Sequence, residues 1–198
     1  DAIMRDMKAG IFAPIYILMG DESYYIDQIS NYIQTHVLLL DQQAFDQTVV
    51  FGADVNAAQV ADMAMQFPMM SPRRVIIIKE AQGMRSYDRL EKYAEHPQPK
   101  TVLVFCYKNG TINQRTKFVT SVERVGVVFE SKKMKEWQLP GYVQTFLAKR
   151  SVTIDEKSAH MIADHIGADL NRLNSELEKL IISIPENFSK NATTLMDK

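Results

Sequence analysis

Short apolar runs alternate with amphipathic segments along the first 130 residues of the chain. Several runs are apolar at almost every position, which is typical of strands buried on both faces of a sheet. The alternation of strands and helices favours a parallel sheet, and right-handed crossovers then place helices on both of its faces. The sequence therefore predicts an α/β fold whose five strands are Ile15 to Met19, Gln47 to Phe51, Val75 to Lys79, Thr101 to Tyr107 and Gly126 to Glu130.

Between these runs, apolar residues recur at helical spacing. The stretch from Ile26 to Val37 predicts one helix. Asn56, followed three residues later by Gln59, is typical of a capping box and predicts the start of a second. Two further helices are predicted over Tyr87 to Ala94 and Arg115 to Glu123. Together they supply the layers that cover the sheet.

The pattern changes after Glu130. A lysine-rich stretch that ends at Pro140-Gly141 predicts a linker, and three amphipathic stripes after it predict a small three-helix domain. From Pro185 onward the periodicity is lost, which we interpret as a frayed or incomplete end. We expect an α/β domain at residues 1–135 and a three-helix domain at residues 136–198.

Composition excludes several classes of protein. Apolar residues make up 46% and charged residues 24% of the chain, as in an ordinary globular protein and unlike a disordered one. No run of about 18 apolar residues is present to span a membrane, and the first residues lack the apolar core of a secretory signal. Cys106 is the single cysteine, so it forms no internal disulfide and no cysteine-based zinc site. A cytoplasmic protein is expected.

Charge is distributed unevenly. The net charge is −1 overall, but residues 1–99 carry −5, residues 100–150 carry +7 and residues 151–198 carry −3. The basic segment is either a solvated surface or a face that meets an anionic partner, such as nucleic acid or an acidic subunit. The candidate DNA or subunit contacts in it are Lys108, Arg115, Lys117, Lys132 and Lys133.

The turn after the first strand is where an α/β nucleotide-binding protein places its phosphate loop. Such a loop needs glycines, a lysine and a hydroxyl in the pattern GxxxxGK[ST]. Here the turn consists of Gly20, Asp21, Glu22 and Ser23, with no lysine and with two carboxylates where phosphate would lie. The acids suit the positive end of the following helix instead. Lys79 ends the third strand, where a nucleotide-hydrolysing protein needs an aspartate for Mg²⁺.

No other catalytic constellation stands out. His160 and His165 are five residues apart and do not share a helix face as metal ligands would, and no GxSxG motif occurs. Cys106 has no nearby histidine to activate it. We therefore expect no catalytic residue, no metal and no cofactor.

The segment QFPMMSPRR, residues 66–74, lies between the second predicted helix and the third strand. Pro68 ends the helix and Pro72 precedes the strand, so Met69 and Met70 lie in a stiff loop. Two interpretations remain open. Phe67 and both methionines cover the edge of the sheet, or they project and bind a partner, for which the adaptable thioether side chain is suited.

With these features, the chain resembles the delta subunit family of the bacterial DNA polymerase III clamp loader. The resemblance covers nearly all of residues 10–184, and the pattern from Ile166 to Leu180 is its most specific part. The segments that carry it are YILMGDESYYIDQI (16–29), FPMMSPRRVIIIKEA (67–81), TVLVF (101–105), KEWQLP (135–140) and IGADLNRLNSELEKL (166–180).

The resemblance implies an AAA+-like module with a degenerate, non-hydrolysing nucleotide site, followed by a three-helix lid. It also implies a third, helical collar domain that assembles the loader. We expect that domain to be absent from this chain and assembly to be impaired. Intrinsic catalysis is not expected, although the family is part of a DNA-directed DNA polymerase holoenzyme.

The resemblance further implies that the protein opens the β sliding clamp during DNA replication by inserting an adjacent apolar pair, commonly Leu-Phe. Met69 and Met70 align with that pair, and Phe67 supplies a ring nearby. The implied partners are the clamp, the gamma/tau and delta prime subunits and, through the complex, DNA, with no membrane. The alternatives are an ATP-hydrolysing loader subunit and a DNA-binding module that uses residues 100–150.

Overall fold

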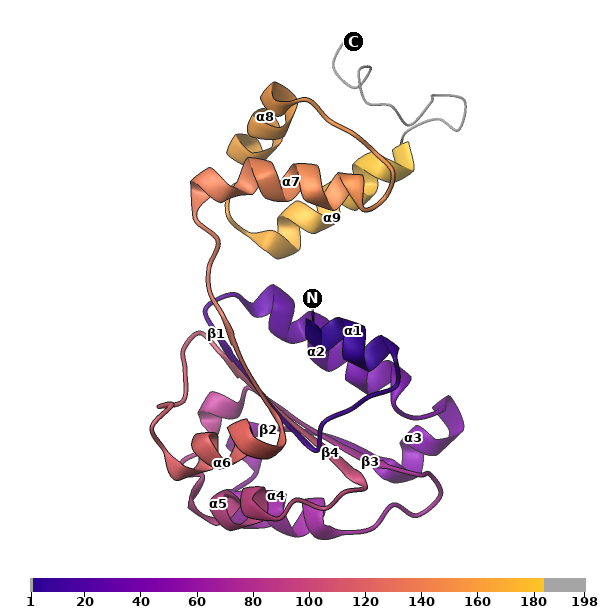
Figure 1. Ribbon diagram of the computed structural model, residues 1–198, viewed down its shortest axis with the longest axis vertical. Coiled ribbons are helices and arrows are strands. Elements are labelled where there is room, and N and C mark those ends of the chain that lie inside the picture. The colour runs from indigo at the N-terminus through magenta and orange to yellow at the C-terminus, as the bar shows by residue number, and fades with distance from the viewer. Residues whose placement is uncertain (1, 184–198) are drawn as a thin grey trace. The chain divides into compact units, whose positions relative to one another are not determined.

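The computed structural model describes residues 2–183. The chain divides into two compact units, the first ending at Lys132 and the second beginning at Lys133 (Figure 1). No helix in the described part of the chain is long and apolar enough to cross a membrane.

The first unit is built on a five-stranded sheet in which every pairing is parallel. Its strand order is β2-β3-β4-β1-β5, so β1 lies between β4 and β5, and β2 and β5 are the edges. All five predicted strands are present. Their bounds are β1 Ile15–Gly20, β2 Gln47–Phe51, β3 Arg74–Lys79, β4 Thr101–Lys108 and β5 Val127–Ser131.

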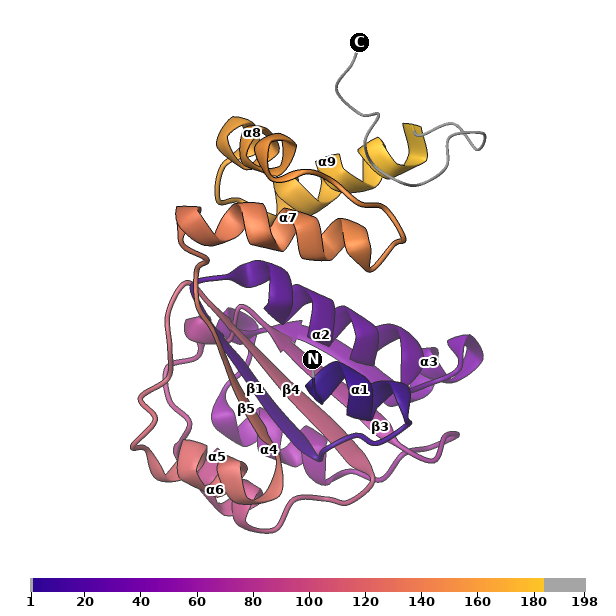
Figure 2. The same ribbon diagram turned by 45° about the horizontal axis from the view of Figure 1, so that its top comes forward.

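Helices cover both faces of this sheet, as Figure 2 shows for the first unit. One layer contains α1 and α2, and the other contains α4, α5 and α6. The bounds are α1 Ala2–Lys8, α2 Ser23–His36, α4 Ala57–Met65, α5 Asp88–Glu95 and α6 Lys117–Val125. The predicted α/β fold class, a parallel sheet between two helical layers, is confirmed.

The burial of β1 explains why its sequence is continuously apolar. Ile15, Ile17 and Met19 pack in the core beneath α4 to α6, whereas Tyr16 and Leu18 pack in the core beneath α2. Each of these side chains is at most 2% exposed. Because successive residues of a strand point to opposite faces, a strand covered on both sides needs an apolar residue at every position.

Two helices of the first unit have no counterpart in the sequence prediction. α1 is a single short helix, and α3 spans Leu40–Asp46 immediately before β2. Asp46 is the one residue that α3 buries, so the sequence of this helix has no apolar stripe. Hydrophobic periodicity therefore could not reveal it. Two 3₁₀ turns, Gly52–Asp54 and Ala81–Gly83, complete the connections.

The second unit contains a 3₁₀ turn and the three predicted helices. Their bounds are Glu136–Gln138 for the turn, α7 Leu139–Ala148, α8 Glu156–Ile166 and α9 Leu170–Ser183. Val143, Ala159 and Leu173, one from each helix, are fully buried. The prediction that Pro140-Gly141 belongs to a linker is wrong, because both lie in the first turn of α7, where a proline costs no hydrogen bond. The segment from Pro185 lies outside the described residues.

Candidate functional site

The turn from β1 to α2 is shaped by its contact with the end of β5. Gly20 has a φ of +130°, and a Cβ atom built on it would lie 1.9 Å from the backbone oxygen of Ser131. Only glycine allows the two backbones to approach so closely. The packing of β5 against this turn therefore explains Gly20 without any phosphate.

Backbone N–H groups of this turn are already hydrogen-bonded within the protein. The N–H of Gly20 donates to the Gly110 carbonyl at 2.8 Å, and that of Asp21 donates to the Ser131 carbonyl at 3.0 Å. The Glu22 carboxylate, which is buried, caps α2 by accepting the N–H of Tyr24 at 3.1 Å. The expectation that an acid of this turn serves the helix start is confirmed for Glu22. A phosphate would have to displace these bonds.

Lysines occupy the carboxyl ends of β3 and β4. Lys79 ends β3, and Lys108 ends β4 in register with Gly20. The Lys108 ammonium lies 2.8 Å from the Asp27 carboxylate of α2 and 3.9 Å from that of Glu80. Because this partly exposed ammonium is already paired with carboxylates of the same chain, the structure gives no support to Lys108 as a DNA-binding residue.

Residues 66–73 form the loop between α4 and β3, here called the 66–73 loop. Phe67, Met69 and Met70 have exposed fractions of 67%, 76% and 63%. They therefore do not cover the edge of the sheet, which was one of the two interpretations of the segment. Both ends of the loop are anchored. Thr101 Oγ1 donates to the Ala64 carbonyl at 2.9 Å, and the N–H of Arg74 donates to the Lys100 carbonyl at 2.7 Å.

The middle of the 66–73 loop is held by Asp46, the last residue of α3. The N–H groups of Met69, Met70 and Ser71 donate to its two carboxylate oxygens at 2.5, 2.8 and 2.9 Å. The Ser71 hydroxyl adds a fourth bond at 2.8 Å. Burial raises the pKa of Asp46, but the hydrogen bonds from the loop outweigh it and hold the pKa below the usual range. Sequence reasoning missed this residue.

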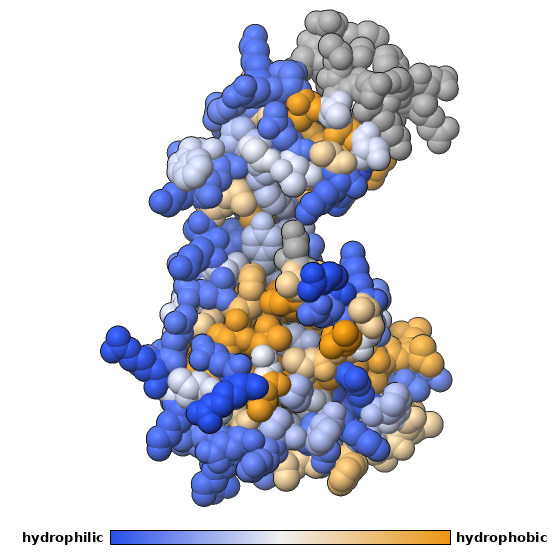
Figure 3. All heavy atoms as spheres, viewed as in Figure 1, coloured by the Kyte–Doolittle hydropathy of each residue, from blue (hydrophilic) through white to orange (hydrophobic). Residues whose placement is uncertain are grey.

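Further exposed apolar side chains lie on α3 itself. Leu40 is 85% and Phe45 is 51% exposed, although Phe45 immediately precedes the buried Asp46. Figure 3 shows hydrophobic atoms gathered over the α3 part of the first unit. The 66–73 loop is thus hydrogen-bonded to the last residue of a helix that exposes two large apolar side chains, Leu40 and Phe45.

The other basic candidates differ from Lys108. Arg115, Lys117, Lys132 and Lys133 are all exposed. Lys132 lies 3.7 Å from the Glu130 carboxylate, an exposed pair of the kind that contributes little to stability. These four side chains are accessible to solvent and to an anionic partner.

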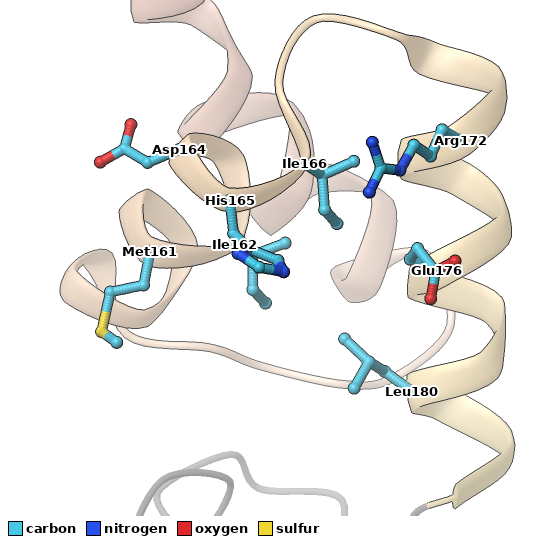
Figure 4. Close-up of a pocket in the computed structure, with 8 residues that line it drawn as sticks. All are labelled: Met161, Ile162, Asp164, His165, Ile166, Arg172, Glu176 and Leu180. Carbon is cyan, nitrogen blue, oxygen red and sulfur yellow. The ribbon is translucent and has the colours of Figure 1, made fainter.

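The second unit has an open groove between α8 and α9. In Figure 4, Arg172 and Glu176 project from α9 toward α8, with Ile162 and Ile166 between the helices. The lining mixes apolar and oppositely charged groups and contains no glycine-rich turn. Among residues 2–183, no cluster of histidine, cysteine and acidic side chains could hold a metal ion.

Comparison with known proteins gives one consistent result. Residues 16–132 match the family described as DNA polymerase III, delta subunit, a range that ends where the first unit ends. The chain is 21% identical over 188 residues to the DNA polymerase III subunit delta of Bacillus subtilis strain 168. The matched region covers 90% of this chain and 54% of that protein. The chain therefore spans about half the length of this curated relative.

One solved structure shares the fold. The Bacillus subtilis DNA clamp loader delta protein superposes with a TM-score of 0.77 at 20% identity, covering 93% of this chain and 57% of that one. A DNA polymerase III gamma subunit-related protein of Thermotoga maritima has a TM-score of 0.49 at 15% identity, covering 96% of this chain and 68% of that one. The second value is too low to carry an argument.

Proposed function

The chain belongs to the DNA polymerase III delta subunit family, and on that premise we propose that it binds the β sliding clamp through the 66–73 loop and helps to open it. The observation that carries the proposal is the pair of adjacent methionines, 76% and 63% exposed, on a loop whose backbone is fixed. Such an apolar pair fits a hydrophobic pocket on a partner.

Opening a ring requires more than tight binding. A ligand shifts a conformational equilibrium only by the difference between its affinities for the two states. The loop must therefore bind a strained clamp conformation better than the closed one. A preformed loop serves this purpose, because little of its binding free energy is lost in ordering the loop itself.

We propose that the chain does not hydrolyse ATP. The occupied N–H groups after β1 and Lys79 at the end of β3 support this, since they take the positions expected for the phosphate loop and for the aspartate that holds Mg²⁺. ATP then acts through other subunits of the loader. The alternative of an ATP-hydrolysing subunit requires these internal bonds to break.

A second role, contact with DNA or a neighbouring subunit, is supported by the exposure of Arg115, Lys117, Lys132 and Lys133. Contacts between lysine or arginine and phosphate weaken steeply as salt increases. We place this role within the assembled loader.

The test is calorimetric titration of the chain with the sliding clamp of the same organism. Burying a methionine contributes about 1.5–3 kcal/mol, so Met69→Ala/Met70→Ala should weaken binding by about a hundredfold or more. Met161→Ala is the matched control, because Met161 is also exposed, at 50%, but lies on α8 of the second unit. Unchanged affinity of the double variant would refute the proposal.

A further inference from the structure

Asp46 is a fully buried carboxylate that accepts four hydrogen bonds from the 66–73 loop. It stands in contrast to the residues that it holds, because Met69 and Met70 expose most of their side chains. The backbone of the loop is thus fixed from within while its side chains face outward.

The location of Asp46 follows from the sheet. β2 and β3 are parallel, and Gln47, the first residue of β2, pairs with Val75 of β3. Asp46, the residue before β2, therefore lies at the same end of the sheet as the loop that leads into β3, where both strands begin. This brings together two positions that are 23 to 25 residues apart in sequence.

The chemistry of the site requires a carboxylate. Three N–H groups in succession converge on one group, and an anion with two oxygens can accept all of them. An asparagine of the same shape offers one acceptor oxygen and would direct an NH₂ group at the remaining donors. A buried charge is costly unless it is compensated in this way.

We infer that Asp46 is a positioning residue for partner binding: it fixes the backbone of Met69, Met70 and Ser71 so that both methionines are presented in one conformation. The inference rests on the proposed clamp contact. Without Asp46, the segment between Pro68 and Pro72 would be ordered only on binding, and the affinity for the clamp would fall by about tenfold to a hundredfold.

The experiment measures amide hydrogen exchange by NMR and clamp affinity by calorimetry on the whole chain. In the unmodified protein, the Met69 and Met70 amides should exchange slowly despite their place in an exposed loop. In Asp46→Asn they should exchange about tenfold faster or more, with amides of β4 unchanged, and clamp binding should weaken by about tenfold or more. The exchange measurement separates anchoring of the loop from a general loss of stability.

Ser71→Ala is the matched control, since it removes the hydroxyl with its contacts to Asp46 and to the Arg73 carbonyl and leaves the three N–H bonds to Asp46. It should weaken clamp binding by no more than about threefold. If Asp46→Asn does not fold, the unmodified chain still decides: fast exchange of the Met69 and Met70 amides would overturn the inference, and slow exchange supports it.

The outcomes also distinguish this inference from the proposed function. If Met69→Ala/Met70→Ala loses binding while Asp46→Asn keeps full affinity, the inference about Asp46 is wrong and the loop contact stands. If the double alanine variant binds the clamp like the unmodified chain, the proposed contact is wrong, and with it the role of Asp46 in binding.

Discussion

Replacing Gly20 by alanine tests whether the turn after β1 is fixed by packing against β5. The φ of +130° at this position is one that residues with a side chain rarely adopt, and such strain costs about 1–3 kcal/mol. The new Cβ would also lie 1.9 Å from the Ser131 oxygen, so one of the two strand ends has to move.

That movement has a predictable cost. The two shorter hydrogen bonds between the turn and Ser131 run from the Asp21 N–H to the Ser131 carbonyl at 3.0 Å and from the Ser131 hydroxyl to the Glu22 carbonyl at 2.8 Å; the Glu22 N–H donates to the Ser131 carbonyl at 3.5 Å. A typical hydrogen bond contributes about 0.5–1.5 kcal/mol. Together with the backbone strain, Gly20→Ala should lower the free energy of unfolding by about 2–6 kcal/mol, a large part of the stability of an ordinary domain.

Urea unfolding followed by far-UV circular dichroism measures this loss, and two other glycines serve as controls. Gly10 has a φ of +78° with nothing within 4 Å of a built Cβ, so Gly10→Ala should cost about 1–2 kcal/mol from backbone strain without overlap. Gly141 has open space and no positive φ, so Gly141→Ala should be neutral or stabilising by up to about 1 kcal/mol. If Gly20→Ala were within about 1 kcal/mol of the unmodified chain, packing against β5 could not be the reason for the glycine.

Two further predictions concern the first unit. Burial raises the pKa of the Cys106 thiol to about 11, so about one thiol in a thousand is ionised at pH 8. Alkylation of Cys106 should therefore be slow in the folded chain and should accelerate on unfolding. Fast labelling of the folded chain would contradict the burial of this thiol. Because the unfolded thiol ionises at lower pH than the folded one, the thiol also makes unfolding easier as pH rises from about 9 to 11, which urea titrations across that range will measure. At the start of α4, the Asn56 side chain accepts a hydrogen bond from the Gln59 N–H at 3.0 Å as part of a capping box. Asn56→Ala should therefore lower the free energy of unfolding by about 0.5–2 kcal/mol, whereas Asn56→Asp should change it little. Equal losses in both variants would show that the cap is not the cause.

Much of the first unit could be predicted because its three central strands, β1, β3 and β4, are buried on both faces. The run from Val75 to Ile78 has no polar residue, and a short run that is apolar at every position is readily recognised as a central strand. The capped start of α2 was likewise readable, because Glu22 lies two residues after Gly20 and immediately before a helical repeat. Such patterns can be read from neighbouring residues alone, because the burial or the helix cap that they indicate involves a single strand or turn.

The remaining features depend on contacts between distant segments. Asp46 could not be recognised from the sequence because its partners are Met69 to Ser71, and only the register of β2 on β3 brings them together. The ion pair of Lys108 was likewise not visible in the sequence, because only the fold places Asp27 beside this lysine of the basic segment. Charge counts along a chain do not reveal which charges neutralise one another in space.

The attachment of the 66–73 loop to Asp46, which immediately precedes β2, makes the order of the loop depend on an edge strand. β2 is an edge strand with one neighbour, and edges of this kind are the most readily frayed part of a sheet. Detachment of β2 would carry Asp46 away from the loop. A molecule in which β2 is unpaired would thus present no ordered methionine pair, so the proposed clamp contact would form only on molecules in which this strand has joined the sheet.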